Sequence, residues 1–263
     1  MHKNMNSIFM EEKLSTATAF AQNNSDLNLV NQFMILANKT VQYAVSANVK
    51  LRAFSSPHLP YFSKLNTQDK QTVIEQLKTY NEICELVLSN AGDLADSSTL
   101  TWYALKKFNL RFPSDLFNFI EADSVVEVYD RSNVQIFRNF RFFEFSSYSL
   151  EDLLCRTWTE LFTRGDESHT QSILDTSKKF YTKEITTVTP LSHVGAHRIS
   201  ESDSPYSYVM DATIDFLAPI YEQDRYPCGF IAIESPKIVS DMPEGLQAEE
   251  MLHKYYQRKE QSL

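Results

Sequence analysis

The chain has 263 residues, a hydrophobic share of 43%, a net charge of −9 and only five glycines. So few glycines argue against dinucleotide-binding folds and P-loops, because these need clustered glycines to bring backbone N–H groups close to phosphate. The charge is uneven: residues 1–120 carry 11 Lys/Arg against 10 Asp/Glu, and residues 121–237 carry 11 against 19. The second part therefore repels phosphate backbones and makes a poor nucleic-acid surface.

The three cysteines, Cys84, Cys155 and Cys228, are widely spaced and form no CxxC pair. This pattern argues against a disulfide framework or a zinc ribbon and favours a reducing compartment, so we expect a cytoplasmic protein. No run of eighteen apolar residues is present, which predicts no membrane association by a spanning helix. The N-terminal sequence MHKNMNSIFMEEK places acids where a signal peptide needs an apolar core.

Residues 1–25 are polar and are expected to form a flexible N-terminus. From Asp26, a plausible N-cap, apolar residues recur at three- and four-residue spacing and predict a helix that ends near Ser55, before two prolines. The buried stripe of this helix is predicted to contain Val30, Phe33, Met34, Ala37, Val41, Ala44 and Val45.

Three more helices are predicted before residue 122. One is capped by Thr67 and ends before Gly92, a second covers 98–108, and a third covers 114–121. Residues 26–121 are thus expected to form an all-α helical domain.

After Glu121 the hydrophobic period changes from 3.6 to 2. The pattern predicts strands over 125–129 and 134–137 with a tight turn between them. A helical aromatic segment is expected over 139–146, followed by a helix capped by Ser149.

The remainder is predicted to form a helix over 167–182, a polar mobile loop over 192–207, and long strands over 211–221 and 229–234. In the first long strand, Ala212, Ile214, Phe216, Ala218 and Ile220 are expected to share one face. Residues 238–263 are expected to form a linker and a charged C-terminal helix.

The segment NFRFFEFSSYSLEDLL, residues 139–154, resembles the central signature of the PAS family. In that family an Asn that ends the second strand precedes aromatic helix residues and then a Gly-Tyr-Ser-x-Glu-Glu-Leu-x-Gly motif. The closing segment 219–230 is similar to the final hairpin of the family. Ser147 and Cys155 stand where the family usually has Gly. The resemblance covers about residues 123–237 and does not extend to the N-terminal helices.

The resemblance implies an α+β chain, in which a five-stranded antiparallel sheet with flanking helices occupies 122–237. It implies a sensory or signalling module that binds a small ligand or a protein partner, dimerises, and transmits its state through terminal helices. The hypothetical pocket would be lined by Tyr129, Phe137, Phe142, Tyr148, Trp158, Phe162, Phe180, Ile214 and Phe216. The alternative is that these aromatic residues only fill the core.

The cofactor is left unknown, because neither a flavin nor a haem signature is present. In Asn139-Phe140-Arg141-Phe142, a Phe stands where a flavin photosensor of this family has its reactive Cys. His169 has polar neighbours typical of a solvated side chain and not of a haem ligand. His193 and His197 are four apart, but Gly195 and the Ser-rich flank predict a loop and not a metal site.

No catalytic motif is found, so an enzyme is not expected. Two alternatives stay open. The segment 98–108, with Lys106 and Lys107, could act as the recognition helix of a transcriptional regulator. Asp215, among apolar neighbours, is the one candidate for an acid with a raised pKa in an enzyme cavity.

Overall fold

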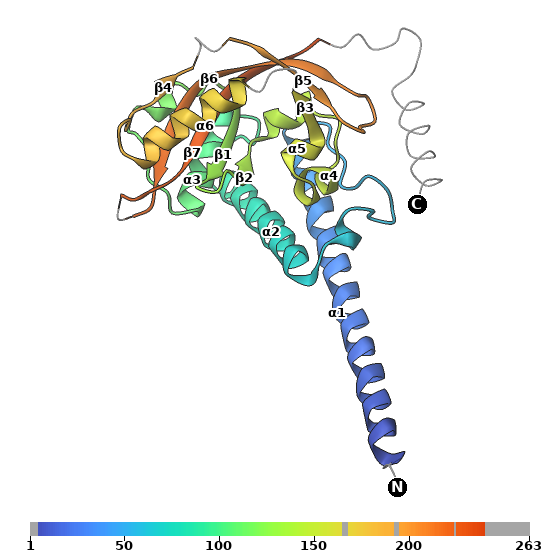
Figure 1. Ribbon diagram of the computed structural model, residues 1–263. Coiled ribbons are helices and arrows are strands. Elements are labelled where there is room, and N and C mark those ends of the chain that lie inside the picture. The colour runs from blue at the N-terminus through green and yellow to red at the C-terminus, as the bar shows by residue number, and fades with distance from the viewer. Residues whose placement is uncertain (1–4, 165–167, 192–194, 224, 240–263) are drawn as a thin grey trace, which may run out of the picture.

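The structure, a computed structural model, describes residues 5–164, 168–191, 195–223 and 225–239. Side chains are described from Asp26 onward within these ranges, apart from Thr159. N-terminal helices pack on one face of a curled antiparallel sheet, and a second set of helices crosses the opposite face (Figure 1). The predicted C-terminal helix lies outside the described residues.

Helix α1 spans Met5–Ser46, so it begins well before the predicted start at Asp26 and ends before the predicted end near Ser55. The helix stops early because Asn48 adopts the left-handed conformation, with φ of 59°. Its first half extends away from the rest of the chain (Figure 1). Asp26 lies inside the helix and is not an N-cap; its carboxylate pairs with Lys70 Nζ at 3.3 Å. Val45, expected in the buried stripe, is exposed, whereas Phe33 and Ala37 are fully buried as predicted.

Helix α2, Thr67–Ser89, is capped by Asn66 and not by Thr67, since the Asn66 side chain accepts from the Asp69 N–H. A buried hydrogen bond of 2.9 Å from Thr40 Oγ1 to Asn81 Oδ1 joins α1 to α2. Because both side chains are removed from water, this bond fixes how the two helices sit against each other.

The turn after α2 differs from the expected one. Ala91, not Gly92, adopts the left-handed conformation, with φ of 58°. Gly92 is needed for space, because a Cβ there would lie 2.9 Å from Val87 Cγ1. Helix α3, Ser97–Lys107, matches its prediction closely, while the expected helix over 114–121 is only the short η2, Leu116–Asn118.

Within the described ranges the sheet has seven strands, two more than the predicted five, in the order β2-β1-β7-β6-β5-β3 with β4 paired to β6. They are β1 Val125–Asp130, β2 Gln135–Arg138, β3 Phe162–Arg164, β4 Thr189–Pro190, β5 His197–Glu201, β6 Val209–Tyr221 and β7 Pro227–Ile238. The mobile loop predicted over 192–207 is wrong in part, since β5 forms there and pairs with β6.

Four helical segments cross the inner face of the sheet: η3 Phe140–Phe145, α4 Leu150–Cys155, α5 Trp158–Leu161 and α6 Ser168–Tyr181. The start of α4 is confirmed as predicted. Ser149 and Asp152 form a capping box, in which each side chain accepts from the backbone N–H of the other residue.

Two irregularities decide which side chains face inward. In the β1–β2 pair the register shifts after Val128, so Arg138 lies opposite Glu127 and Gln135 lies opposite Tyr129. Both residues of β2 therefore share the inner face of the sheet with Glu127 and Tyr129. A second shift lies between Ile214 and Phe216 in β6.

The core is continuous between the two regions that the sequence suggested as separate domains. One hydrophobic cluster combines Phe33, Leu77 and Leu105 of the helical layer with Val126 and Ile231 on the outer face of the sheet. The side chain of Asn139, at the end of β2, accepts from Val126 N–H and donates to Ser97 Oγ at the start of α3. The helices and the sheet are thus packed as one body along this face.

Candidate functional site

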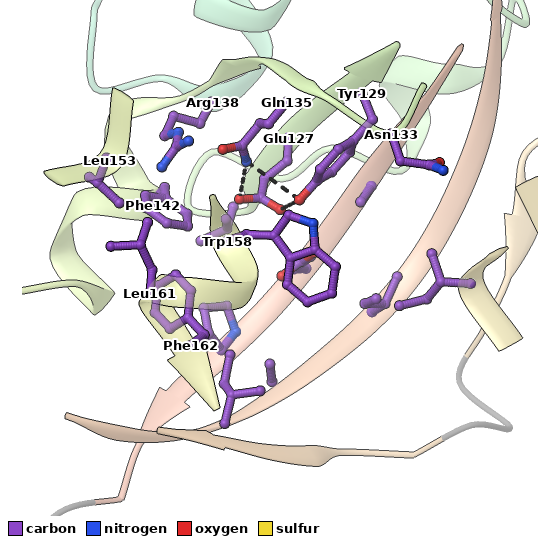
Figure 2. A pocket seen from close by; sticks show the side chains of 18 of the residues that line it. Glu127, Tyr129, Asn133, Gln135, Arg138, Phe142, Leu153, Trp158, Leu161 and Phe162 are labelled. Carbon is purple, nitrogen blue, oxygen red and sulfur yellow. Dashed lines mark hydrogen bonds between the residues drawn. The ribbon is translucent and has the colours of Figure 1, made fainter. Parts of the chain in front are cut away.

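A cavity of about 490 Å³ lies between the inner face of the sheet and the helices that cross it (Figure 2). Its floor is formed by the inward side chains of β1, β2, β6 and β7. Its roof is formed by η3, α4, α5 and α6. Cavities of 300–1,000 Å³ are the usual size of small-molecule sites.

Five of the nine residues predicted to line a pocket lie on the wall of this cavity: Tyr129, Phe142, Trp158, Phe162 and Ile214. They come from β1, η3, α5, β3 and β6, so elements far apart in the sequence converge here (Figure 2). That they bind a ligand stays a prediction.

The other four predicted residues lie elsewhere. Phe137 stacks on Tyr80 of α2, with ring centroids 5.7 Å apart, and Phe216 packs on Phe119, so both face the helical layer. Phe216 was expected beside Ile214, but the register shift in β6 turns it to the opposite face.

Tyr148 and Phe180 are buried beside the cavity and do not line it. The Tyr148 hydroxyl lies 2.6 Å from the Ser202 carbonyl oxygen, and its ring packs edge-on against Phe162. Phe180 belongs to a separate cluster under α6 with Leu191 and Leu217. These two aromatic residues fill the core, as the alternative interpretation expected of all nine.

The polar part of the cavity centres on the Glu127 carboxylate, which is buried. One of its oxygens accepts from the Tyr129 hydroxyl at 2.5 Å, and the other accepts from the Gln135 amide (Figure 2). Burial, followed by the neighbouring Glu127 charge, raises the pKa of Tyr129 well above its usual value. Tyr129 is therefore a neutral hydrogen-bond donor at physiological pH.

A second carboxyl group, Glu234 of β7, lies beside Glu127. In the β1–β7 pair Val125 is opposite Glu234, so Glu127 and Glu234 are diagonal neighbours on the inner face. Burial raises the pKa of Glu234 well above its usual value, and repulsion from Glu127 raises it further. Glu234 therefore holds its proton more tightly than an isolated carboxyl group would.

Three arginines line the same cavity, and two of them have protein partners. Arg156 pairs with Asp152 at 3.4 Å and stacks over Tyr61. Arg164 donates to Thr170 and lies over the Trp158 ring. The guanidinium of Arg138 makes no hydrogen bond or ion pair to any described residue, and it lies 4.7 Å from the centre of the Phe142 ring.

His197, predicted in a loop, lies on β5 and faces the cavity, where its ring stacks on His169 of α6 with centroids 5.0 Å apart. His169 is thus packed against a ring and is not the solvated side chain expected. Burial, then the charges of Arg164 and His169, lowers the pKa of His197 to about 4. Among the described residues no cluster of three or more His, Cys, Asp or Glu could hold a metal ion, and His193 lies outside them.

No family model and no curated protein matches the sequence. Within the part of the chain that the structure describes, no helix combines the length and apolar character needed to cross a lipid bilayer. The site is therefore interpreted from its own residues.

The polar residues of the cavity were missed at the sequence level. Glu127 could have been found, because it alternates with Val125 and Tyr129 and so shares their face. Glu234 alternates in the same way with Phe230. Arg138 has no such signal, since the register shift that turns it inward depends on how β1 and β2 pair.

Two further candidate sites from the sequence remain, namely Asp215 and the lysine pair of α3. Asp215 lies in the irregular part of β6, where it accepts from Ser235 Oγ at 2.6 Å, and it is not on the cavity wall. In α3, Lys107 pairs with Glu82 at 2.6 Å and Lys106 lies over the Trp102 ring. Both lysines have intramolecular partners, and the DNA-binding alternative stays a prediction.

Proposed function

We propose that the chain is a PAS-type sensory module, which holds a small organic ligand in the cavity and passes the occupancy of that cavity to α1. The cavity itself is the observation that carries this proposal. The two strands at the start of 125–238, the helices after them and the closing strand pair support this proposal, because the sequence resemblance implies these elements in this order. Strands β3, β4 and β5 lie between them.

A buried carboxylate supports the idea that a change in the cavity is transmitted to α1. Helix α4 contributes Leu153 and Leu154 to the wall. On the same helix Glu151, fully buried, accepts from the backbone N–H groups of Tyr61 at 2.8 Å and Phe62 at 3.1 Å. A small shift of α4 on ligand binding would therefore pull directly on the segment between α1 and α2.

The next contact of this route lies on α1 itself. The Phe62 ring stacks on Phe33 of α1, with centroids 4.3 Å apart and planes 16° apart. Both rings are fully buried, so they move together or lose their packing. We propose that α1 carries the output, either to a second copy or to a signalling partner. Its exposed apolar residues, Ile35 and Val45, would take part in that contact.

Hydrogen exchange tests this function. A library of small organic molecules is first screened by thermal stabilisation, and exchange is then measured by mass spectrometry with and without a stabilising compound. We expect slower exchange in the cavity strands and also in residues 51–64 and α1. Protection confined to the cavity, with no change in 51–64 or α1, would contradict the transmission. Met210→Ala, a wall variant on β6 and not on the transmitting helix α4, serves as the weakened-binding control.

A further inference from the structure

The unpartnered arginine in the cavity identifies a class of ligand, on the assumption that the proposed sensory function holds. Arg138 is on the wall, and Glu127 lies opposite it in the β1–β2 register. Even so, no carboxylate oxygen of a described residue lies within 4.0 Å of its guanidinium. Glu127 already accepts from Tyr129 and Gln135.

A cation removed from bulk water is costly unless an anion pairs with it. Burial lowers the pKa of Arg138, which reports this cost. The other two wall arginines differ, since Arg156 forms an ion pair with Asp152 and Arg164 donates a hydrogen bond to Thr170. The missing partner of Arg138 is therefore the group that a ligand can supply.

The remaining walls limit what that ligand can be. Glu127 lies opposite Arg138, and Glu234 lies beside Glu127 on the same face of the sheet, so these two carboxyl groups disfavour a ligand with a second negative charge. Phe142, Trp158 and Phe162 give the cavity aromatic surfaces, which favour an apolar body.

We propose that the cavity binds a small organic monocarboxylate with an aromatic or apolar body, and that Arg138 pairs with its carboxylate. The planar guanidinium can donate two parallel hydrogen bonds to a carboxylate, which gives orientation as well as affinity. The apolar body then lies against the aromatic side chains of the wall, Phe142, Trp158 and Phe162.

Tryptophan fluorescence can measure ligand binding in the cavity. In the Trp102→Phe background, Trp158 on the wall is the sole indole, so its fluorescence reports occupancy of the cavity. The probes are phenylacetate and 3-phenylpropanoate, each beside its neutral amide, and phenyl phosphate as a dianion. Isothermal calorimetry on the wild type checks each affinity without a fluorophore.

We expect each carboxylate to bind about tenfold or more tightly than its amide, and Arg138→Gln to remove that preference. Arg138→Lys, which keeps the charge but loses the paired donors, should give an intermediate affinity and also serves if the Gln variant does not fold. Arg198→Gln, at an exposed arginine on β5 paired with Asp211, should bind like the wild type.

Equal binding of acid and amide, tighter binding of phenyl phosphate, or an unchanged affinity in Arg138→Gln would overturn the ligand class. Failure of both acids to bind at millimolar concentration would overturn it as well. A neutral compound that still protects 51–64 from exchange would leave the sensory function standing. The proposed sensory function is contradicted only if no bound ligand slows hydrogen exchange in residues 51–64 and α1.

Discussion

Glu151 accepts a hydrogen bond of 2.8 Å from the backbone N–H of Tyr61, so the helix that roofs the cavity is held to the connection between α1 and α2. The same carboxylate also accepts from the N–H groups of Phe62 and Ser55. This contact joins the region that contains the cavity to the N-terminal helices. It therefore provides a physical link between the cavity and α1.

Glu151→Gln tests that contact. The amide keeps the size of the side chain but places an NH₂ group near three backbone donors, so we expect a loss of about 1–3 kcal/mol in the free energy of unfolding. Chemical denaturation measures it, and hydrogen exchange should speed up in residues 51–64. Glu144→Gln, at a partly exposed residue on η3 paired with Arg141, should change stability little. A Glu151→Gln variant as stable as the wild type would show that this contact contributes little to the free energy of unfolding.

The raised pKa of Glu234 predicts one pH dependence of the stability. Because its folded pKa is raised, the folded chain keeps this proton above about pH 4.3, where the unfolded chain has lost it. Stability should therefore fall as the pH rises from about 4.3 toward the folded pKa. Glu234→Gln removes this group from the titration, so the difference in stability between variant and wild type should grow in favour of the variant over that range. A difference that does not vary with pH would contradict the raised pKa.

The lowered pKa of His197 predicts the opposite slope of stability over an overlapping pH range. Its folded pKa of about 4 lies below the ordinary value near 6.5, so the unfolded chain binds a proton that the folded chain resists. Stability is expected to fall as the pH drops from about 6.5 toward 4. His197→Gln should flatten this part of the profile, measured as thermal midpoint against pH. If the variant and the wild type lose stability in parallel, His197 is not the group responsible.

Gly229 tests how closely β1 and β7 approach. A Cβ at this position would lie 2.0 Å from the carbonyl oxygen of Tyr129, a contact that requires the backbone to move. Gly229→Ala should therefore cost about 1–3 kcal/mol and disturb the strand that carries Tyr129 and Glu127. Lys237→Ala, at an exposed site on the same strand, is the matched control. Equal unfolding midpoints for the two variants would show that the strands tolerate the side chain.

Local side-chain chemistry made part of the fold predictable. Two local features were found from the sequence: the helix start capped by Ser149 and the tight turn between β1 and β2. Both depend on residues within four positions of each other, since Asp130 in the turn accepts from the N–H groups of Ser132 and Val134. Strand β5 was missed because His197–Glu201 is polar and takes its place only by pairing with β6. The start of α1 was missed because residues 5–25 lack the apolar stripe that marked its second half.

The candidate site was predictable where side chains alternate regularly between the two faces of the sheet along a strand. Tyr129 and Ile214 were placed correctly on the inner face, while Phe216 was not, because an irregularity in β6 reverses the pattern after Ile214. Arg138 was missed for a similar reason in the β1–β2 pair. Irregular pairing between strands is decided by tertiary packing, and no spacing within one strand shows it.

Native mass spectrometry of the freshly purified protein, beside its denatured mass, tests the central claim most directly. Ala232→Phe is compared with the wild type, since Ala232 is buried on the cavity floor and a phenyl ring there would occupy the space of a ligand. The circular dichroism spectrum establishes that the variant is folded. We expect the wild type to carry an added small mass, either retained from the host or supplied as a compound found by thermal screening. Folded Ala232→Phe should carry none. A wild type that holds no compound under either condition, or a variant that holds it equally well, would contradict a ligand-binding cavity.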